Sequence, residues 1–229
     1  GPAINRSSER NPGILVILIA GGEALTPDLA HKLQQRSAVL WHTYGPAEAA
    51  VVCTMGIIPP EAKVITIGRP HDNIQIYLLD EHLEPVPVGA TGELYIGGDG
   101  VGRGYYNRPE LTAEKFIPNP FVDNDASGHP LMYRTGDLAR FLPDGQIVFV
   151  GRNDLQVKIR GNRIELGDVE AAIRRHPAIA QNLVLTHQDT PGDLYLVAYL
   201  IPEHGLKIPD GRELRQFLRR TLPDYMLPS

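Results

Sequence analysis

The stretch GRNDLQVKIRGNRIELGDVE, residues 151–170, joins a short strand to the start of a helix. Apolar and polar residues alternate in Leu155–Ile159, which predicts a strand with one buried face, and Arg160–Asn162 then breaks the pattern with residues that favour a turn. Three apolar residues after Gly167 share one helical face: Val169, Ala172 and Ile173. The residues alone leave two interpretations open, a solvated hairpin before a surface helix or a connector with a function of its own.

An α/β unit is predicted upstream of this stretch. The apolar run Gly13–Ala20 is far too short to span a bilayer and leads into two glycines, which favours a buried parallel strand. Thr26-Pro27-Asp28 supplies a side-chain cap, a proline at the first helical position and a first-turn acid, so a helix is expected from there to about Ser37. Two leucines of this helix are expected to face the core: Leu29 and Leu33. A second strand is predicted at Val39–Thr43.

Both strands of this unit run into turns that contain glycine and polar residues, Gly21–Glu23 and Tyr44–Glu48. Strands joined by one crossover helix are parallel and end at the same edge of a sheet, so both turns are expected to face one crevice. Ligands of open α/β sheets bind at that edge.

Beyond Met55, short apolar runs separated by Gly, Pro and Asp predict an antiparallel β region with the character of a distorted barrel. Its strands are expected at Val64–Ile67, Ile74–Leu79, Glu93–Ile96, Leu138–Phe141 and Gln146–Val150. The glycine cluster Gly97–Gly104 matches neither a phosphate-binding loop nor a dinucleotide fingerprint, and tight turns explain it equally well.

A second, smaller α+β domain is predicted after the opening stretch, with the boundary at Arg152–Leu155 and the two domains at residues 1–152 and 153–229. Its elements are a helix over Leu166–Arg175, strands at Leu183–Thr186 and Leu194–Leu200, and a last helix capped by Asp210.

The composition restricts the class of protein. Of 229 residues, 42% are apolar and 21% charged, which is typical of a soluble globular chain. The net charge of -5 argues against nucleic acid or an anionic membrane as the main partner. The single cysteine, Cys53, excludes an internal disulfide framework, fits a reducing compartment and is expected to be a buried small apolar residue.

Five motifs occur in order: YGPAE at 44–48, GELYIGGDGVGRGY at 92–105, YRTGDL at 133–138, the opening stretch at 151–170 and LPDYMLP at 222–228. Together they resemble the adenylation domains of nonribosomal peptide synthetases, which belong to the AMP-forming acyl and aminoacyl adenylating superfamily. The resemblance covers about Asn11 to Pro228 and is closer to the peptide-synthetase branch than to the luciferases. It implies the end of a large adenylate-forming domain with a distorted β-barrel, followed by a small α+β subdomain.

The resemblance also implies a nucleotide site. Tyr44 would stack on adenine and Glu48 would hold Mg2+ as a catalytic residue. Asp137 would accept both ribose hydroxyls, and Arg152 would donate to the ribose or a phosphate. Three more residues are assigned to this site: Gly22, Glu23 and His42, the last of which stands where Asn is common. Without a ligand, half-buried packing explains Tyr44 and helix capping explains Glu48.

A substrate pocket is implied around the same two strands. The matching positions are Leu18, Ala20, Thr43, Val51 and Val52. They are mostly apolar, which favours an acid with an uncharged side chain. Core packing is the alternative explanation.

The resemblance gives the opening stretch a role as a hinge. Asp154 would be the pivot about which the small domain rotates between two poses. Lys158, close to this hinge, is implied to contact the nucleotide as a second catalytic residue, and Arg160 and Gly161 would shape the entry route of a thiol.

The implied activity is that of a cytoplasmic ligase in the synthesis of an antibiotic or other secondary metabolite. It would use ATP and Mg2+ to convert an amino or carboxylic acid to an acyl-adenylate, and then transfer the acyl group to phosphopantetheine on a peptidyl carrier protein. Neighbouring synthetase domains would be partners; nucleic acid and membranes would not.

Two segments of the family pattern are expected outside this chain: the phosphate-binding loop before Gly1 and the catalytic lysine after Ser229. Ala47 also stands where Thr often contacts phosphate. The fragment alone is therefore expected to be inactive. Two alternatives remain, an acyl-CoA ligase of the same superfamily and a non-catalytic scaffold or carrier-docking fragment.

Overall fold

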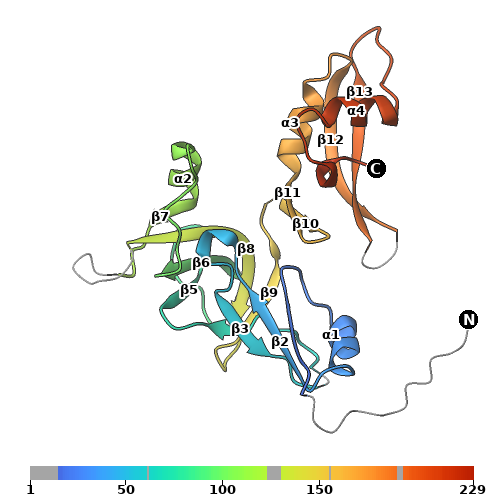
Figure 1. The fold of residues 1–229 in the computed structure, drawn as a ribbon. Helices are drawn as coiled ribbons and strands as arrows, with labels where there is room; N and C mark the ends of the chain where they lie inside the picture. Colours follow the sequence, from blue (N-terminus) through green and yellow to red (C-terminus); the bar gives the residue numbers. More distant parts are fainter. Residues whose placement is uncertain (1–14, 61, 123–129, 155, 190–192) are drawn as a thin grey trace, which may run out of the picture. The chain divides into compact units, whose positions relative to one another are not determined.

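The structure is a computed structural model that describes residues 15–60, 62–122, 130–154, 156–189 and 193–229. The chain divides into two compact units, unit 1 at Gly1–Asn153 and unit 2 at Asp154–Ser229. Figure 1 shows unit 1 in blue to yellow and unit 2 in orange to red. Each unit has its own sheets and its own apolar core.

Unit 1 begins with a sheet of order β1-β2-β3-β4, which lies beside helix α1 in Figure 1. The elements are β1 (Ile17–Gly21), α1 (Pro27–Gln34), β2 (Val39–Tyr44), the 3-10 turn η1 (Ala47–Ala49), β3 (Thr54–Ile57) and β4 (Arg69–Pro70). β1 and β2 are parallel with Gly21 opposite Thr43, which confirms the predicted β-α-β unit. The predicted cap of α1 is confirmed as well, because Thr26 Oγ1 accepts a hydrogen bond from the Leu29 backbone N–H.

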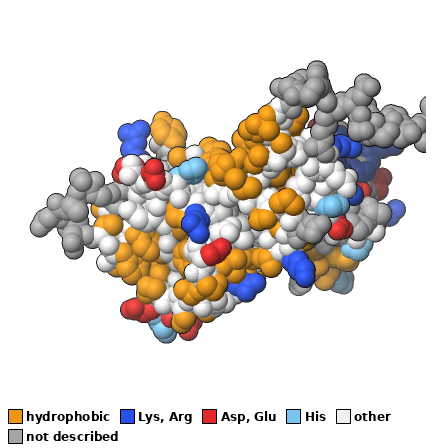
Figure 2. Space-filling view, turned by 90° about the horizontal axis from the view of Figure 1, so that it is seen from below, with side chains coloured by type: hydrophobic (Ala, Val, Ile, Leu, Met, Phe, Trp, Pro, Cys, Tyr) orange, Lys and Arg blue, Asp and Glu red, His pale blue; other side chains and the backbone are white. Residues whose placement is uncertain are grey.

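Two burial predictions for this sheet are wrong. Ile19 on β1 is 66% exposed, because alternate residues of a strand point to opposite faces and α1 covers only the face that carries Leu18 and Ala20. Leu29 is 47% exposed, since Ala30 and Leu33 take the core side of the helix instead. Figure 2 shows that hydrophobic side chains reach the surface on the face that it displays. The first two residues of the predicted strand, 13 and 14, lie outside the described residues.

A curled antiparallel sheet forms the rest of unit 1, with β9 added to β8 beyond the order β5-β6-β8-β7. Its elements are β5 (Ile74–Leu79), β6 (Gly92–Gly98), α2 (Pro109–Lys115), β7 (Phe116–Pro118), β8 (Leu131–Phe141) and β9 (Ile147–Arg152). The mixed α/β and β character predicted from sequence is confirmed. β8 is much longer than predicted and carries a register shift after Leu138.

The predicted strand at Val64–Ile67 is absent. Thr66 instead bonds outward with its backbone carbonyl to the His42 ring and with its hydroxyl to the Gln146 side chain. Ile67 donates its N–H to the Ile147 carbonyl. These scattered partners supply hydrogen bonds to the polar groups of the segment without a strand ladder. The strand that pairs with β2 is β3.

Cys53 is fully buried, as predicted, and its thiol donates to the Ala49 carbonyl at 2.8 Å. Burial raises the pKa of this thiol to about 12. Because only the thiolate is nucleophilic, and it makes up about one part in ten thousand at pH 8, we expect no measurable reaction of the native chain with DTNB. The urea-unfolded chain should react at once. Labelling of the native chain at the rate of the unfolded one would contradict the buried placement.

Unit 2 is a small α+β unit. Its elements are β10 (Gln156–Ile159), β11 (Asn162–Glu165), α3 (Leu166–Arg174), β12 (Ile179–Gln188), β13 (Leu194–Pro202), α4 (Gly211–Leu218) and the 3-10 turn η2 (Asp224–Met226). The predicted core face of α3 is confirmed: Val169, Ala172 and Ile173 are buried. Asp210 caps α4 as predicted, accepting from two backbone N–H groups at 2.9 and 2.8 Å. Residue 155, the start of the predicted strand, lies outside the described residues.

The β10–β11 hairpin turns through Arg160 and Gly161, which have φ of 51° and 77°. Two consecutive residues with positive φ are the mark of a type I′ turn, whose geometry matches the twist of the flanking strands. Glycine adopts this conformation freely, whereas arginine does so at a cost.

We therefore expect Gly161→Ala to lower the free energy of unfolding of unit 2 by about 1–2 kcal/mol. Arg160→Asn, the matched control, should be neutral or stabilising, because Asn tolerates positive φ. Urea unfolding followed by circular dichroism measures the loss. The fluorescence of Trp41, the single tryptophan of the chain, follows unit 1 separately. If Gly161→Ala and wild type unfold at the same urea concentration by circular dichroism as well as by Trp41 fluorescence, the turn assignment is contradicted.

Candidate functional site

The carboxylate of Asp137 lies in the middle of β8 and is only 6% exposed. Arg152, its partner in the register of β8 and β9, donates from Nη1 to Asp137 Oδ1. The Tyr44 hydroxyl, at the end of β2, donates to Asp137 Oδ2. Two sheets of unit 1 thus bring Tyr44 and Arg152 into direct contact with Asp137.

The turn-like backbone around Asp137 is fixed by Thr135. The Thr135 hydroxyl donates to the Leu94 carbonyl at 2.6 Å and accepts from the Asp137 N–H at 2.9 Å. Arg152 Nη2 donates to the Thr135 carbonyl at 2.9 Å, and Gly136 adopts a φ of 75°. The carboxylate is therefore held at one place and in one orientation before any ligand arrives.

Tyr44 is buried and contacts Phe149 with ring centroids 6.5 Å apart. Burial, and next to it the negative charge of Asp137, raises the pKa of the Tyr44 hydroxyl well above its usual range. The hydroxyl is therefore protonated at neutral pH and can donate to the carboxylate. Stacking on adenine stays a prediction for this ring.

Glu48 lies in η1, directly after β2, and its side chain is half-buried. Its Oε1 accepts a hydrogen bond from the Tyr105 hydroxyl at 2.6 Å. Ala50 and Val51, which follow, have φ of 59° and 69° and reverse the chain sharply. Among the described residues, no group of three or more His, Cys, Asp or Glu side chains is arranged to hold a metal ion by itself.

The remaining residues predicted for the nucleotide site have different surroundings. Gly22 turns the chain after β1 with a φ of 87°, and the exposed Glu23 follows it. His42 is buried, with Nδ1 2.7 Å from the Thr66 carbonyl oxygen, so its ring is part of the interior of unit 1. The structure therefore groups Tyr44, Asp137 and Arg152 directly.

The five residues predicted to line a substrate pocket do not all share one face. Leu18 and Ala20 pack into the cluster under α1, and Ala20 pairs with His42 in the parallel register. Thr43, one residue further along β2, points to the opposite face and donates from its hydroxyl to the Ala20 carbonyl at 3.3 Å. Val51 is exposed and Val52 half-buried. The pocket assignment stays a prediction.

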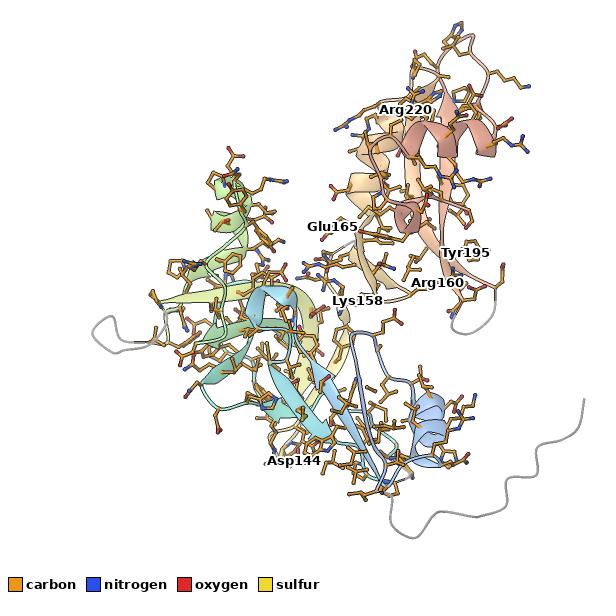
Figure 3. The ribbon with its side chains drawn as sticks, in the orientation of Figure 1. Asp144, Lys158, Arg160, Glu165, Tyr195 and Arg220 are labelled. Carbon is orange, nitrogen blue, oxygen red and sulfur yellow. The ribbon has the colours of Figure 1, made fainter. Side chains whose placement is uncertain are left out.

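The residues predicted for the hinge and the thiol route belong to unit 2. Asp154 Oδ1 accepts from the Gln156 N–H at 3.1 Å, which fixes the first turn of this unit. Figure 3 shows Lys158 and Arg160 on the β10–β11 hairpin. Arg160 Nη2 donates to Asp193 Oδ1 at 3.1 Å, and both side chains are largely exposed.

Two residues of this region make contacts that were not predicted, Thr135 with Leu94 and Tyr105 with Glu48. Each lies inside a motif quoted above, next to residues with an assigned role, so its position in the motif was the available signal. Their partners, Leu94 and Glu48, are 41 and 57 residues away in the sequence. Periodicity and local spacing do not report contacts over such distances.

Two models of known protein families match the chain. The family model described as AMP-binding enzyme matches residues 2–106, and the model described as AMP-binding enzyme C-terminal domain matches residues 168–229. The chain belongs to the AMP-binding enzyme family. Within this family, its relatives are nonribosomal peptide synthetases, as the motifs had indicated.

Three relatives illustrate the similarity of this AMP-binding enzyme. Tyrocidine synthase 3 of Brevibacillus parabrevis is 47% identical over 92% of the chain, which covers 3% of the synthase. An artificially fused adenylation-PCP di-domain of a synthetase from Klebsiella oxytoca has a TM-score of 0.75 at 30% identity, over 93% of this chain and 39% of its own. A four-domain nonribosomal peptide synthetase bound to AMP and glycine has a TM-score of 0.55 at 41% identity. The match covers 92% of this chain and 15% of that synthetase.

This AMP-binding enzyme chain spans 3% of the length of tyrocidine synthase 3 and 4% of bacitracin synthase 1 of Bacillus licheniformis. What such large relatives do as a whole therefore enters only as a proposal. None of the helices within the described residues is both long and apolar enough to cross a membrane.

Proposed function

We propose that the protein containing this chain activates an amino acid with ATP. The products would be an aminoacyl-adenylate and pyrophosphate, and the acyl group would then pass to the phosphopantetheine thiol of a peptidyl carrier protein. The observation that carries the proposal is the buried Asp137 carboxylate held between Tyr44 and Arg152. The family match and the synthetase relatives support the same activity.

The chemistry of Asp137 suits a ribose. A carboxylate offers about four lone-pair positions, so Asp137 can accept from both ribose hydroxyls and still keep its contact with Arg152. A ribose hydroxyl would take the place of the Tyr44 hydroxyl on Oδ2, and the Tyr44 ring would turn to meet the base. Arg152 would add positive charge beside the sugar and the α-phosphate.

Glu48 fits a Mg2+ ion that is shared with the nucleotide. Its carboxylate is a hard oxygen ligand, and Mg2+ in nucleotide sites is held by one or two carboxylates together with phosphate oxygens. The lack of a three-residue ligand cluster among the described residues agrees with this mode. When bound, Mg2+ supplies positive charge to the phosphates. Glu48 and the residues that orient it are this chain's part of that arrangement.

Unit 2 would provide the moving part. Asp154 is proposed as its pivot, Lys158 as a contact to the nucleotide, and Arg160 with Gly161 as part of the thiol route. Two of the solved relatives contain adenylation and PCP domains, which supports a carrier protein as partner. Neighbouring synthetase domains and a pocket for an uncharged side chain, including Thr43 and Val52, complete the proposal.

Pyrophosphate exchange tests this function. The intact protein that contains this chain should catalyse ATP–pyrophosphate exchange with one or a few amino acids and should load a phosphopantetheinylated carrier domain faster than coenzyme A. Exchange with no acid would refute adenylation, and preference for coenzyme A would favour an acyl-CoA ligase. Calorimetry of this chain with AMP and Mg2+ adds a separate readout, because a scaffold would bind neither at millimolar concentration.

A further inference from the structure

The glycine-rich loop after β6 has no role in the proposed function, yet it contacts Glu48 at two points. The Gly102 N–H donates to the Glu48 carbonyl at 2.7 Å. The Tyr105 hydroxyl donates to Glu48 Oε1 at 2.6 Å. One loop therefore holds both the backbone and the carboxylate of the proposed metal ligand.

Tyr105 is itself held from several sides. Its N–H donates to Thr112 Oγ1 at 2.9 Å, which ties it to α2. Its ring meets the ring of Phe116 edge-on, with centroids 5.5 Å apart, and its hydroxyl lies 3.3 Å from that of Tyr133. The hydroxyl that reaches Glu48 thus comes from a side chain with little freedom to move away.

The glycines explain how the loop comes so close. A Cβ at Gly102 would lie 3.0 Å from the Glu48 carbonyl oxygen, tighter than most real contacts. At Gly100 it would lie 2.6 Å from the Ile74 side chain, and Gly104 has a φ of 128° with no room beside Thr112. These glycines therefore allow the loop backbone to approach Glu48 and the neighbouring side chains closely.

We propose that Tyr105 is a positioning residue that orients the Glu48 carboxylate for Mg2+, an inference that rests on the proposed function. A hydroxyl that donates to Oε1 favours the ionised carboxylate and restrains its rotation. Groups that orient a metal ligand in this way strongly affect metal affinity.

The test compares Tyr105→Phe with Tyr106→Phe in the intact protein that contains this chain. Tyr106 is the matched control because it is the next residue and is 91% exposed. The affinity for Mn2+ in the presence of α,β-methylene-ATP is measured by electron paramagnetic resonance. Tyr105→Phe should weaken it about tenfold, the low end for loss of a residue that orients a metal ligand. Tyr106→Phe should change it less than twofold.

Two further readouts separate positioning from packing. AMP affinity without metal should be the same in Tyr105→Phe and wild type, and saturating Mg2+ should restore the turnover of Tyr105→Phe. In a Glu48→Gln background, Tyr105→Phe should cause no further loss of Mn2+ affinity, because the group it orients has lost its charge.

Unchanged Mn2+ affinity in Tyr105→Phe, or an equal loss in Tyr106→Phe, overturns the inference while exchange activity of the wild type still supports the proposed function. If Tyr105→Phe loses as much metal-free affinity for AMP as it loses affinity for Mn2+, the positioning role is overturned in favour of a packing role. A wild type that binds no Mn2+ with the nucleotide and exchanges no pyrophosphate refutes both.

Discussion

Asp137→Asn is expected to weaken AMP binding about a hundredfold. The asparagine has nearly the same shape but no charge, so each bond from a ribose hydroxyl loses its charge assistance. Hydrogen bonds to charged groups contribute about 1.5–3 kcal/mol, and weakening two of them removes about 3 kcal/mol. The dissociation constant for AMP, measured by calorimetry with Mg2+ present, checks the prediction.

The matched control for this variant is Asp144→Asn. Asp144 lies in the turn at the other end of the β8–β9 hairpin, where it accepts hydrogen bonds from Gln146, and Figure 3 labels it. Its loss should leave AMP affinity within twofold of wild type. Because Asp137→Asn also removes the opposite charge beside Arg152, circular dichroism must show that the variant is folded at the assay temperature. A folded Asp137→Asn that binds AMP as wild type does would refute the ribose assignment.

Local signals in the sequence predicted much of the fold. Thr26 and Asp210 cap their helices as expected, because a cap involves residues only two or three positions apart. The short apolar run that predicted a strand at Ile74–Leu79 agrees with β5. The helix α2 was missed because it is short and no side chain caps its start. Val64–Ile67 was overpredicted because its β-branched residues find scattered partners instead of a ladder.

The site shows where local signals end. Tyr44 and Asp137 are 93 residues apart, and nothing in the periodicity of either strand brings them together. Only the resemblance of the two motifs to one family associated them, and it did so through a shared ligand. The direct bond between them is a finding of the structure. It follows from the way β2 and β8 approach each other within unit 1, which depends on packing between sheets.

Strand parity could have sharpened the pocket prediction. Leu18 and Ala20 are two residues apart and necessarily share a face. Whether Thr43 shares it depends on the register between β1 and β2, which sets Ala20 opposite His42 and leaves Thr43 on the other face. The sequence does not contain that register. Apolar character alone therefore does not tell which of these residues pack into the core under α1 and which lie on the other face of the sheet.

The second large effect is expected for Asp154→Pro in the intact protein. Proline fixes φ near −65° and disfavours helical backbone at the residue before it. Asp154 is the first residue of unit 2, and a pivot there must change its backbone angles between two poses. We expect one half-reaction to fall about a hundredfold, as for a misplaced catalytic group, and the other to stay within a few fold. Pyrophosphate exchange measures adenylation, and single-turnover loading of the carrier domain measures thiol transfer.

Asp154→Ala is the control that separates backbone restriction from loss of the carboxylate. Alanine removes the bond from Asp154 Oδ1 to the Gln156 N–H but leaves φ free to change. If the pivot acts through its backbone, Asp154→Ala should keep both half-reactions within a few fold of wild type while Asp154→Pro separates them. Equal losses in both half-reactions for Asp154→Pro would indicate a folding defect, and no loss in either would place the pivot elsewhere. Equal behaviour of the alanine and proline variants would assign the effect to the carboxylate and its turn.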